Sequence, residues 1–193
     1  MRNPKKGTAA RRRSPNPARQ QSASKNWFVR NKVLVLVSGV VVIIALLIGM
    51  LALLGRQPGE AVETQGNEHI ASVNAEHEPY NTDPPTSGPH VDYITSWGVH
   101  REPVPDEEQV HNLEDGGVVV QYGEGVGFEE VKELARITAG YERVVLAPRP
   151  SLPEDQIALT AWGRILRLNS VDEGEIRSFV EAFEGIDHHV AEG

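Results

Sequence analysis

The sequence predicts an α+β domain, with a small antiparallel sheet and two packed helices, preceded by a single transmembrane helix. Three observations support this prediction: one unbroken apolar stretch, short β-rich runs separated by turn signals, and two amphipathic stretches with helical spacing. We place a disordered basic arm at residues 1–32, the transmembrane helix at 33–54, a flexible tether at 55–76, the α+β domain at 77–187 and a loose tail at 188–193.

The apolar stretch begins at Val33 and ends at Leu54, and its only polar side chain is Ser38. A helix of this length would span roughly 30 Å, which is the thickness of the hydrocarbon core of a bilayer. A cleaved signal peptide has a shorter apolar core, about 7–15 residues, and a small-x-small cleavage motif, whereas this stretch continues into Gly55-Arg56. The sequence therefore predicts a retained anchor whose partner is the lipid bilayer.

Charge is distributed unevenly along the chain. Residues 1–32 hold ten of the 19 Lys and Arg residues and no acid, whereas all 27 Asp and Glu residues follow the apolar stretch. Basic flanks stay in the cytoplasm, so we expect a single-pass cell-membrane protein with a cytoplasmic amino terminus and an exterior domain. The acidic surface of this domain would repel the phosphates of a nucleic acid, so we expect no nucleic-acid partner. The absence of cysteine excludes disulfides, thiolate metal sites and cysteine nucleophiles.

Turn signals divide the domain into short elements. Residues 81–90 contain three prolines and predict a stiff loop, which we call the proline loop. Residues 110–113 and 118–122 predict a β-hairpin, because the Asp115-Gly116 pair between them supplies the positive φ angles of a tight turn. Two more β-rich runs are residues 143–147 and residues 157–168, the second forming one bent strand or two strands that meet at Gly163.

Two segments have the apolar spacing of amphipathic helices. Residues 128–138 repeat apolar side chains at helical intervals, with acids in the first turn and Gly140 just beyond the end. The second helix precedes Gly185 and begins with a capping box, formed either by Ser170 with Glu173 or by Asp172 with Glu175. Its apolar stripe consists of Ile176, Phe179, Val180 and Phe183.

Three of the seven histidines, His77, His90 and His111, lie in or beside the proline loop and the predicted hairpin. Histidine is the commonest nitrogen ligand of zinc and copper, and a rigid loop lowers the entropy cost of bringing such side chains to one ion. Together with Asp115, they are candidate ligands of a divalent metal ion such as zinc. In the alternative interpretation His90 caps the loop, His111 is a partly buried hydrogen-bonding residue and Asp115 is a turn residue. The last two histidines of the chain are set aside as adventitious binders.

Three segments of the domain resemble a known family. They are residues 80–90 (YNTDPPTSGPH), residues 110–119 (VHNLEDGGVV) and residues 158–164 (ALTAWGR). These segments resemble the bacterial domain-of-unknown-function family 3105, over about residues 77–183. The resemblance implies a short cytoplasmic arm, one membrane span and an exterior domain, and it implies no established activity. The family usually has a histidine where this chain has Asp115. Aspartate suits zinc, manganese or calcium better than copper, so the departure favours a harder ion or a simple turn.

Three functions are consistent with these observations. The first is a binding or accessory module of the cell envelope, which contacts an envelope protein or holds a divalent metal ion. The alternative is a metal-dependent hydrolytic enzyme, with His90 and His111 as ligands and Asp83, Glu114 or Asp115 as ligand or general base. In the third, the proline loop is a packing element without a ligand. The sequence contains no recognised catalytic motif that would favour the enzyme over the other two functions.

Overall fold

The computed structural model describes residues 31–55 and 57–189, and the chain divides into two compact units between residues 56 and 57. The first unit contains helix α2 (Lys32–Leu54), whose side chains are described at positions 32, 34 and 36–47. Among the residues described, no helix satisfies both the length and the apolarity required of a membrane span. The expected anchor therefore stays a prediction. Of the predicted basic arm at residues 1–32, residues 1–30 lie outside the described residues.

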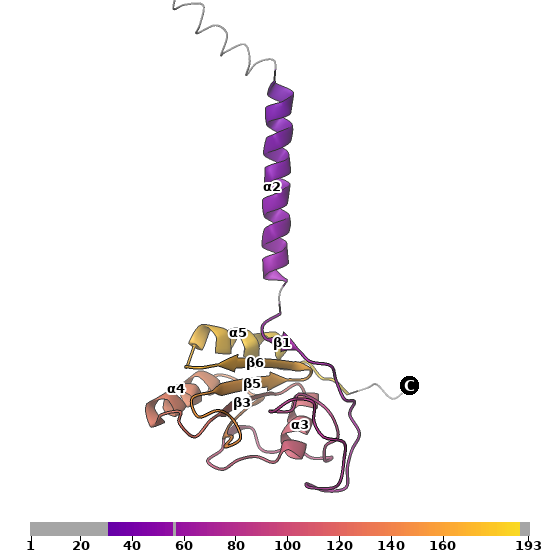
Figure 1. Cartoon of the computed structure of the whole chain (residues 1–193), viewed down its shortest axis with the longest axis vertical. Helices are drawn as coiled ribbons and strands as arrows, with labels where there is room; N and C mark the ends of the chain where they lie inside the picture. Colours follow the sequence, from indigo (N-terminus) through magenta and orange to yellow (C-terminus); the bar gives the residue numbers. More distant parts are fainter. Residues whose placement is uncertain (1–30, 56, 190–193) are drawn as a thin grey trace, which may run out of the picture. The chain divides into compact units, whose positions relative to one another are not determined.

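The second unit is an α+β domain, as predicted, built on one mixed sheet (Figure 1). Its strand order is β1-β6-β5-β3-β4-β2 in the described part of the chain. The strands are β1 (Glu60–Ala61), β2 (Gly98–Val99), β3 (Val118–Tyr122), β4 (Val144–Pro148), β5 (Ile157–Ala161) and β6 (Arg164–Leu168). The helices of this unit are α3 (Asp106–Glu114), α4 (Phe128–Thr138) and α5 (Glu173–Phe183).

The prediction of a small antiparallel sheet was wrong. Strand β4 pairs in parallel with both β3 and β2, whereas the pairs β1–β6, β3–β5 and β5–β6 are antiparallel. The parallel pairing of β3 with β4 follows from α4, which lies between the two strands in the chain. This helix returns the chain to the end of the sheet at which β3 begins, so β4 runs in the same direction as β3. Strands β5 and β6 meet at Gly163, whose φ of +65° suits the tight turn, so one of the two expected arrangements of residues 157–168 is confirmed.

Helices α4 and α5 pack on one face of the sheet and form the main apolar core. This core includes Leu134 and Ile137 from α4 and Phe179 from α5, all fully buried. Both helices were predicted, and the range 128–138 is confirmed for α4. Asp172 caps α5, because its side chain accepts a hydrogen bond from the backbone N–H of Glu175 at 3.0 Å.

Helix α3 covers the opposite face and replaces the first strand of the predicted hairpin. Three acidic residues occupy its first turn, where they complement the helix dipole, and Val110 and Leu113 point to the interior at helical spacing. Gly116, with φ of +76°, ends the helix after Asp115. The Asp-Gly pair that indicated a hairpin turn is therefore a helix stop.

The segment expected to be a tether belongs to the folded unit from Gln57 onward. Strand β1 pairs with β6, and farther along the N–H of Ile70 donates to the carbonyl oxygen of His90 at 2.7 Å. Backbone hydrogen bonds of this kind need no apolar repeat in the sequence, so the segment showed no sign of docking. The carboxyl-terminal segment also docks, since the N–H of His188 donates to the carbonyl oxygen of Glu114 at 2.9 Å. The remainder of the predicted tail, residues 190–193, lies outside the described residues.

Candidate metal centre

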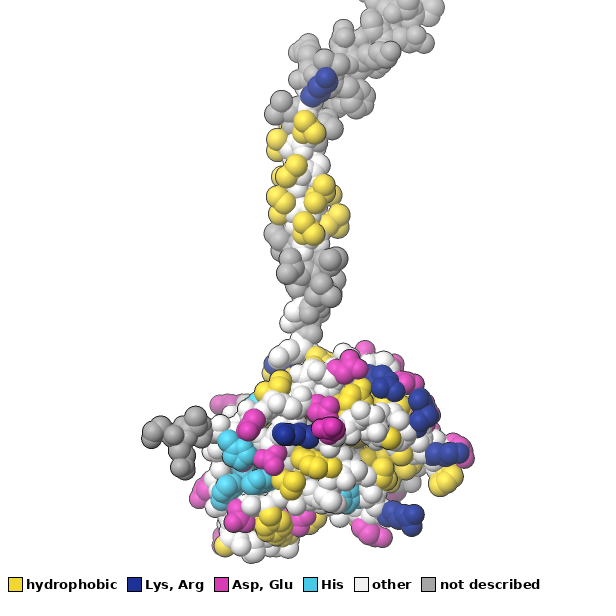
Figure 2. Space-filling view, turned by 180° about the vertical axis from the view of Figure 1, so that it is seen from behind, with side chains coloured by type: hydrophobic (Ala, Val, Ile, Leu, Met, Phe, Trp, Pro, Cys, Tyr) yellow, Lys and Arg dark blue, Asp and Glu magenta, His cyan; other side chains and the backbone are white. Residues whose placement is uncertain are grey.

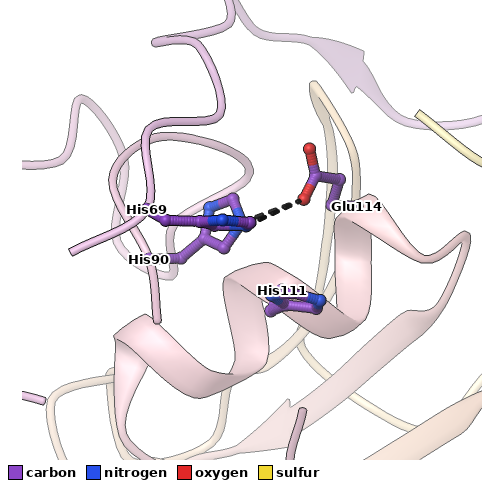
Figure 3. Close-up of side chains that lie close together, drawn as sticks. All are labelled: His69, His90, His111 and Glu114. Atoms are coloured by element: carbon purple, nitrogen blue, oxygen red, sulfur yellow. Dashed lines mark hydrogen bonds and ion pairs between the residues drawn. The ribbon is translucent and has the colours of Figure 1, made fainter. Parts of the chain in front are cut away.

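Three separate segments bring four metal-binding side chains together. Helix α3 contributes His111 and Glu114, the proline loop contributes His90, and the extended segment before it contributes His69 (Figure 3). One nitrogen or oxygen atom from each residue lies within 4.8 Å of the others. We call these four residues the inner cluster.

His90 is fully buried, and both of its ring nitrogens are positioned by neighbours. Its Nδ1 lies 2.8 Å from the carbonyl oxygen of Gly88, and its Nε2 lies 2.9 Å from Oε2 of Glu114. A carbonyl oxygen only accepts hydrogen bonds, so Nδ1 carries the hydrogen and donates it. In the neutral ring, the lone pair of Nε2 then faces the carboxylate.

His111 is held in the same way. Its Nδ1 lies 2.7 Å from the carbonyl oxygen of Val91, which leaves Nε2 as the nitrogen that can bind a metal. Metal-binding histidines commonly donate the second ring N–H to a backbone carbonyl or a carboxylate, because this fixes the tautomer and the ring orientation. Both buried imidazoles of the inner cluster are therefore preset for coordination through Nε2.

Glu114 supplies the carboxyl group of the inner cluster, and only 1% of its surface is exposed. Its Oε1 accepts a hydrogen bond from the side-chain amide of Asn67 at 2.8 Å. Its Oε2 faces Nε2 of His90 at 2.9 Å and Nε2 of His69 at 3.9 Å. Burial lowers the pKa of His90. Its Nε2 and Oε2 of Glu114 thus face each other at hydrogen-bond distance in a position that water does not reach.

The three imidazoles of the inner cluster pack against one another. The ring of His69 stacks on that of His111 at 5.4 Å between centroids, and both rings meet His90 edge-on. The side chain of His69 is 48% exposed, so the inner cluster reaches solvent on that side. Figure 2 shows histidine side chains beside acidic ones on one face of the folded unit.

A second group of possible ligands adjoins the inner cluster and shares one residue with it. Nε2 of His111 lies 3.8 Å from Oδ1 of Asp115, and Nε2 of His189 lies 3.7 Å from the same oxygen. Asp115 and His189 are partly exposed, with 31% and 45% of their side-chain surfaces accessible. We call His111, Asp115 and His189 the outer group.

The structure brings three of the four predicted ligands into this region and leaves one apart. His90 and His111 belong to the inner cluster, and Asp115 lies on its outer side. His77 is elsewhere: its Nε2 is 3.8 Å from a carboxylate oxygen of Glu107, beside a cleft of about 660 Å³. Whether any of the four binds a metal stays a prediction.

Sequence reasoning left three of these residues out of the predicted set of metal ligands. His69 lies in a stretch without apolar periodicity, and no motif around it pointed to a site. Glu114 was named only in the enzyme alternative, as a ligand or general base, and residues 110–113 were interpreted as a strand. Had α3 been recognised, the three-residue spacing of His111 and Glu114 would have placed both side chains on one helical face. His189 was set aside although it lies 3.4 Å from Oε2 of Glu114.

The fold and this cluster define a mixed-sheet α+β domain in which three histidine side chains surround one buried glutamate. Residues 72–192, more than half of the chain, match the model of a family described as "Protein of unknown function (DUF3105)". The chain belongs to this family, and the resemblance drawn from the sequence is confirmed. Searches of curated proteins and of solved structures gave no significant match.

Proposed function

We propose that this chain is a single-pass, membrane-anchored exterior domain that binds one divalent metal ion, such as zinc, through the inner cluster. In this role it is a binding or accessory module of the cell envelope. The 22-residue apolar stretch and the basic residues before it support the anchor and its orientation. An envelope protein would be the partner with which such a module exchanges or presents its ion.

One observation supports the metal above all others. Nε2 of His90 and Oε2 of Glu114 are 2.9 Å apart at a buried position. In a neutral ring whose Nδ1 donates its hydrogen to the carbonyl oxygen of Gly88, Nε2 presents a lone pair to this oxygen. Two acceptors at this distance repel each other, and a buried carboxylate costs several kcal/mol unless it is compensated. A cation coordinated by both atoms would replace the repulsion between them with attraction, and it would also neutralise the buried carboxylate. The ligands would be the Nε2 atoms of the histidines and a carboxylate oxygen of Glu114, a set that suits zinc.

The alternative, a metal-dependent hydrolytic enzyme using His90 and His111, is favoured by the exposed side of His69. A catalytic zinc keeps one coordination position for water, whereas four protein ligands complete a tetrahedral shell. The 660 Å³ cleft is lined by His77 and by none of the inner cluster, so it offers no substrate pocket around these ligands. The binding module is therefore the better supported function.

Metal content and thermal stability test this proposal. The full chain, purified in detergent, should contain about one divalent ion, and a chelator should lower its melting temperature by about 10 °C if the ion is present at about 100 times its dissociation constant. His69→Ala removes a half-exposed ligand and should abolish the chelator effect without preventing folding. His77→Ala is the matched control and should keep both the ion and the effect. Absence of metal together with an unchanged melting temperature would contradict the proposal.

The orientation can be tested by labelling, because the chain has no cysteine of its own. Glu129→Cys introduces a thiol on α4, where the native side chain is 79% exposed, and Ser22→Cys introduces one in the basic arm. A membrane-impermeant maleimide should label Glu129→Cys in intact spheroplasts and Ser22→Cys only after lysis. The opposite pattern would show that the domain is inside.

A further inference from the structure

We propose that the outer group is an entry site, from which a divalent cation passes to the inner cluster through His111. This inference rests on the proposed function, because it concerns the route by which the ion reaches that site. It assigns a role to His189 and Asp115, which the inner cluster does not require.

The carboxyl-terminal segment is held next to the end of α3 by backbone hydrogen bonds, and this places His189 as a possible metal ligand. The N–H of Gly185 donates to the carbonyl oxygen of Gly116 at 2.8 Å, and the N–H of His188 donates to that of Glu114 at 2.9 Å. The ring of His188 stacks on Trp162 with 5.9 Å between centroids. These contacts hold the segment against the carboxyl-terminal end of α3 and bring the ring of His189 beside the last residues of that helix.

His189 has the same preset geometry as the buried histidines. Its Nδ1 lies 2.8 Å from Oδ1 of Asp187, which as a carboxylate accepts the hydrogen bond. In the neutral ring the lone pair of Nε2 is then available to a cation, and this nitrogen lies 3.7 Å from Asp115 Oδ1 and 3.4 Å from Glu114 Oε2. A carboxylate behind a histidine is a common support for a metal ligand.

His111 makes the two sites exclusive. Its Nδ1 is engaged by the carbonyl oxygen of Val91, so one lone pair, on Nε2, serves both groups. The outer group and the inner cluster therefore cannot each hold an ion coordinated by His111 at the same time. The geometry describes two positions for one ion rather than a two-metal centre.

The shared ligand also supplies the route. An ion in the outer group can keep its bond to His111 while Asp115 and His189 are exchanged for Glu114 and His90. Oε2 of Glu114 already lies between the two groups, at 3.4 Å from Nε2 of His189 and 2.9 Å from Nε2 of His90. Exchange one ligand at a time avoids the cost of a bare or fully rehydrated ion in a buried site.

Exposure gives the transfer a direction. The ligands that belong only to the outer group are partly exposed, whereas His90 and Glu114 are almost completely buried. A hydrated cation thus meets accessible ligands first and loses its water in steps. The exposed side of His69 is the competing entrance, and the experiment separates the two.

The test measures the rate of zinc uptake by the metal-free full chain in detergent, followed with a zinc-sensitive dye. His189→Ala and Asp115→Asn should each slow uptake, and also release to a chelator, by about tenfold. The final content should stay at one ion per chain, with the melting shift preserved. His77→Ala is the matched control, because it removes an imidazole that belongs to neither group; its rate should be unchanged.

Three outcomes would overturn the inference. Unchanged uptake in His189→Ala would show that the ion enters past His69. Loss of stoichiometric binding in His189→Ala would show that this residue is a permanent ligand. Two tightly bound ions per wild-type chain would contradict exclusive occupancy. None of these results resembles failure of the proposed function, in which the wild-type chain itself binds no zinc.

Discussion

The two faces of the sheet bury different kinds of residue. The face covered by α4 and α5 holds a core of thirteen buried apolar residues, whereas the apolar cluster on the α3 face has five. Of the eleven buried polar or charged residues found in the described part of the chain, only Thr138 lies on α4 or α5. The others lie on α3, in the proline loop, or at Gln121 and Thr160 on the sheet.

This difference indicates that one face supplies most of the folding stability and the other holds the groups that can bind a ligand. Burial of apolar area gives most of the folding free energy, at about 25 cal/mol per Å², and one face of the sheet supplies most of that area. The α3 face buries groups that are costly to remove from water unless each has a partner. A face of this kind is retained where the polar groups perform a task, which is the arrangement expected of a binding site supported by a rigid core.

The largest expected effect comes from breaking the apolar face. Phe179 is fully buried on α5 and meets the ring of Phe183 at 4.8 Å. We expect Phe179→Ala to lower the free energy of unfolding by about 3–5 kcal/mol, because it removes a large side chain and leaves a cavity. Chemical denaturation at low temperature measures this loss. Zinc content per folded chain should not change, since the substitution is remote from the inner cluster.

Phe128 provides the matched control, because it begins α4 with 80% of its surface exposed. Phe128→Ala should alter the free energy of unfolding by less than about 0.5 kcal/mol. Two results would contradict the assignment of stability to one face and metal binding to the other. They are equal stability of the two alanine variants, and loss of the metal from folded Phe179→Ala.

A smaller effect, with an unusual sign, is expected on the α3 face. Glu114→Gln keeps the shape of the side chain and removes its charge. A glutamine oxygen can still accept from Asn67, and its amide can now donate to the lone pair of His90 Nε2. We expect the metal-free variant to be more stable than the metal-free wild type by about 1 kcal/mol, and to bind no zinc. Thermal melts in chelator, with and without added zinc, measure both.

Glu107→Gln is the control for the loss of a buried charge, because Glu107 is also buried and lies outside the inner cluster. It should not gain stability, since its Oε1 accepts a hydrogen bond from the backbone N–H of Asn74 at 3.0 Å. A loss of stability in metal-free Glu114→Gln would mean that a proton, rather than a metal ion, bridges His90 and Glu114 in the native domain.

The sequence predicted the elements whose signals are local. Helix α4 is marked by its apolar spacing and by acids in its first turn, and α5 by its cap at Asp172. The turn between β5 and β6 is marked by Gly163. Helix α3 was missed because Asp115-Gly116 ends a helix as readily as it turns a hairpin, and only tertiary packing decides between these outcomes. The parallel pairing of β4 is likewise a property of the whole sheet.

The site was partly predictable for the same reason. His90 and His111 stood out because they lie in distinctive segments, and the fold does bring them together. His69 is positioned by backbone pairing between its segment and the proline loop, an interaction that leaves no mark on side-chain pattern. His77 has the same chemistry and an adjacent place in the chain, yet it faces Glu107. Residue type indicated candidate ligands, and the topology of the chain determines which of them lie together.

The pairing of His69 with the proline loop has a further consequence for a chain that has no cysteine. An ion held by His69 and Glu114 would act as a crosslink between distant points of the polypeptide. By the loop-entropy relation used for disulfides, closing a loop of this size would restrict the unfolded chain by about 4 kcal/mol. Unlike a disulfide, this crosslink would hold under oxidising and reducing conditions alike, and its strength would follow the supply of metal.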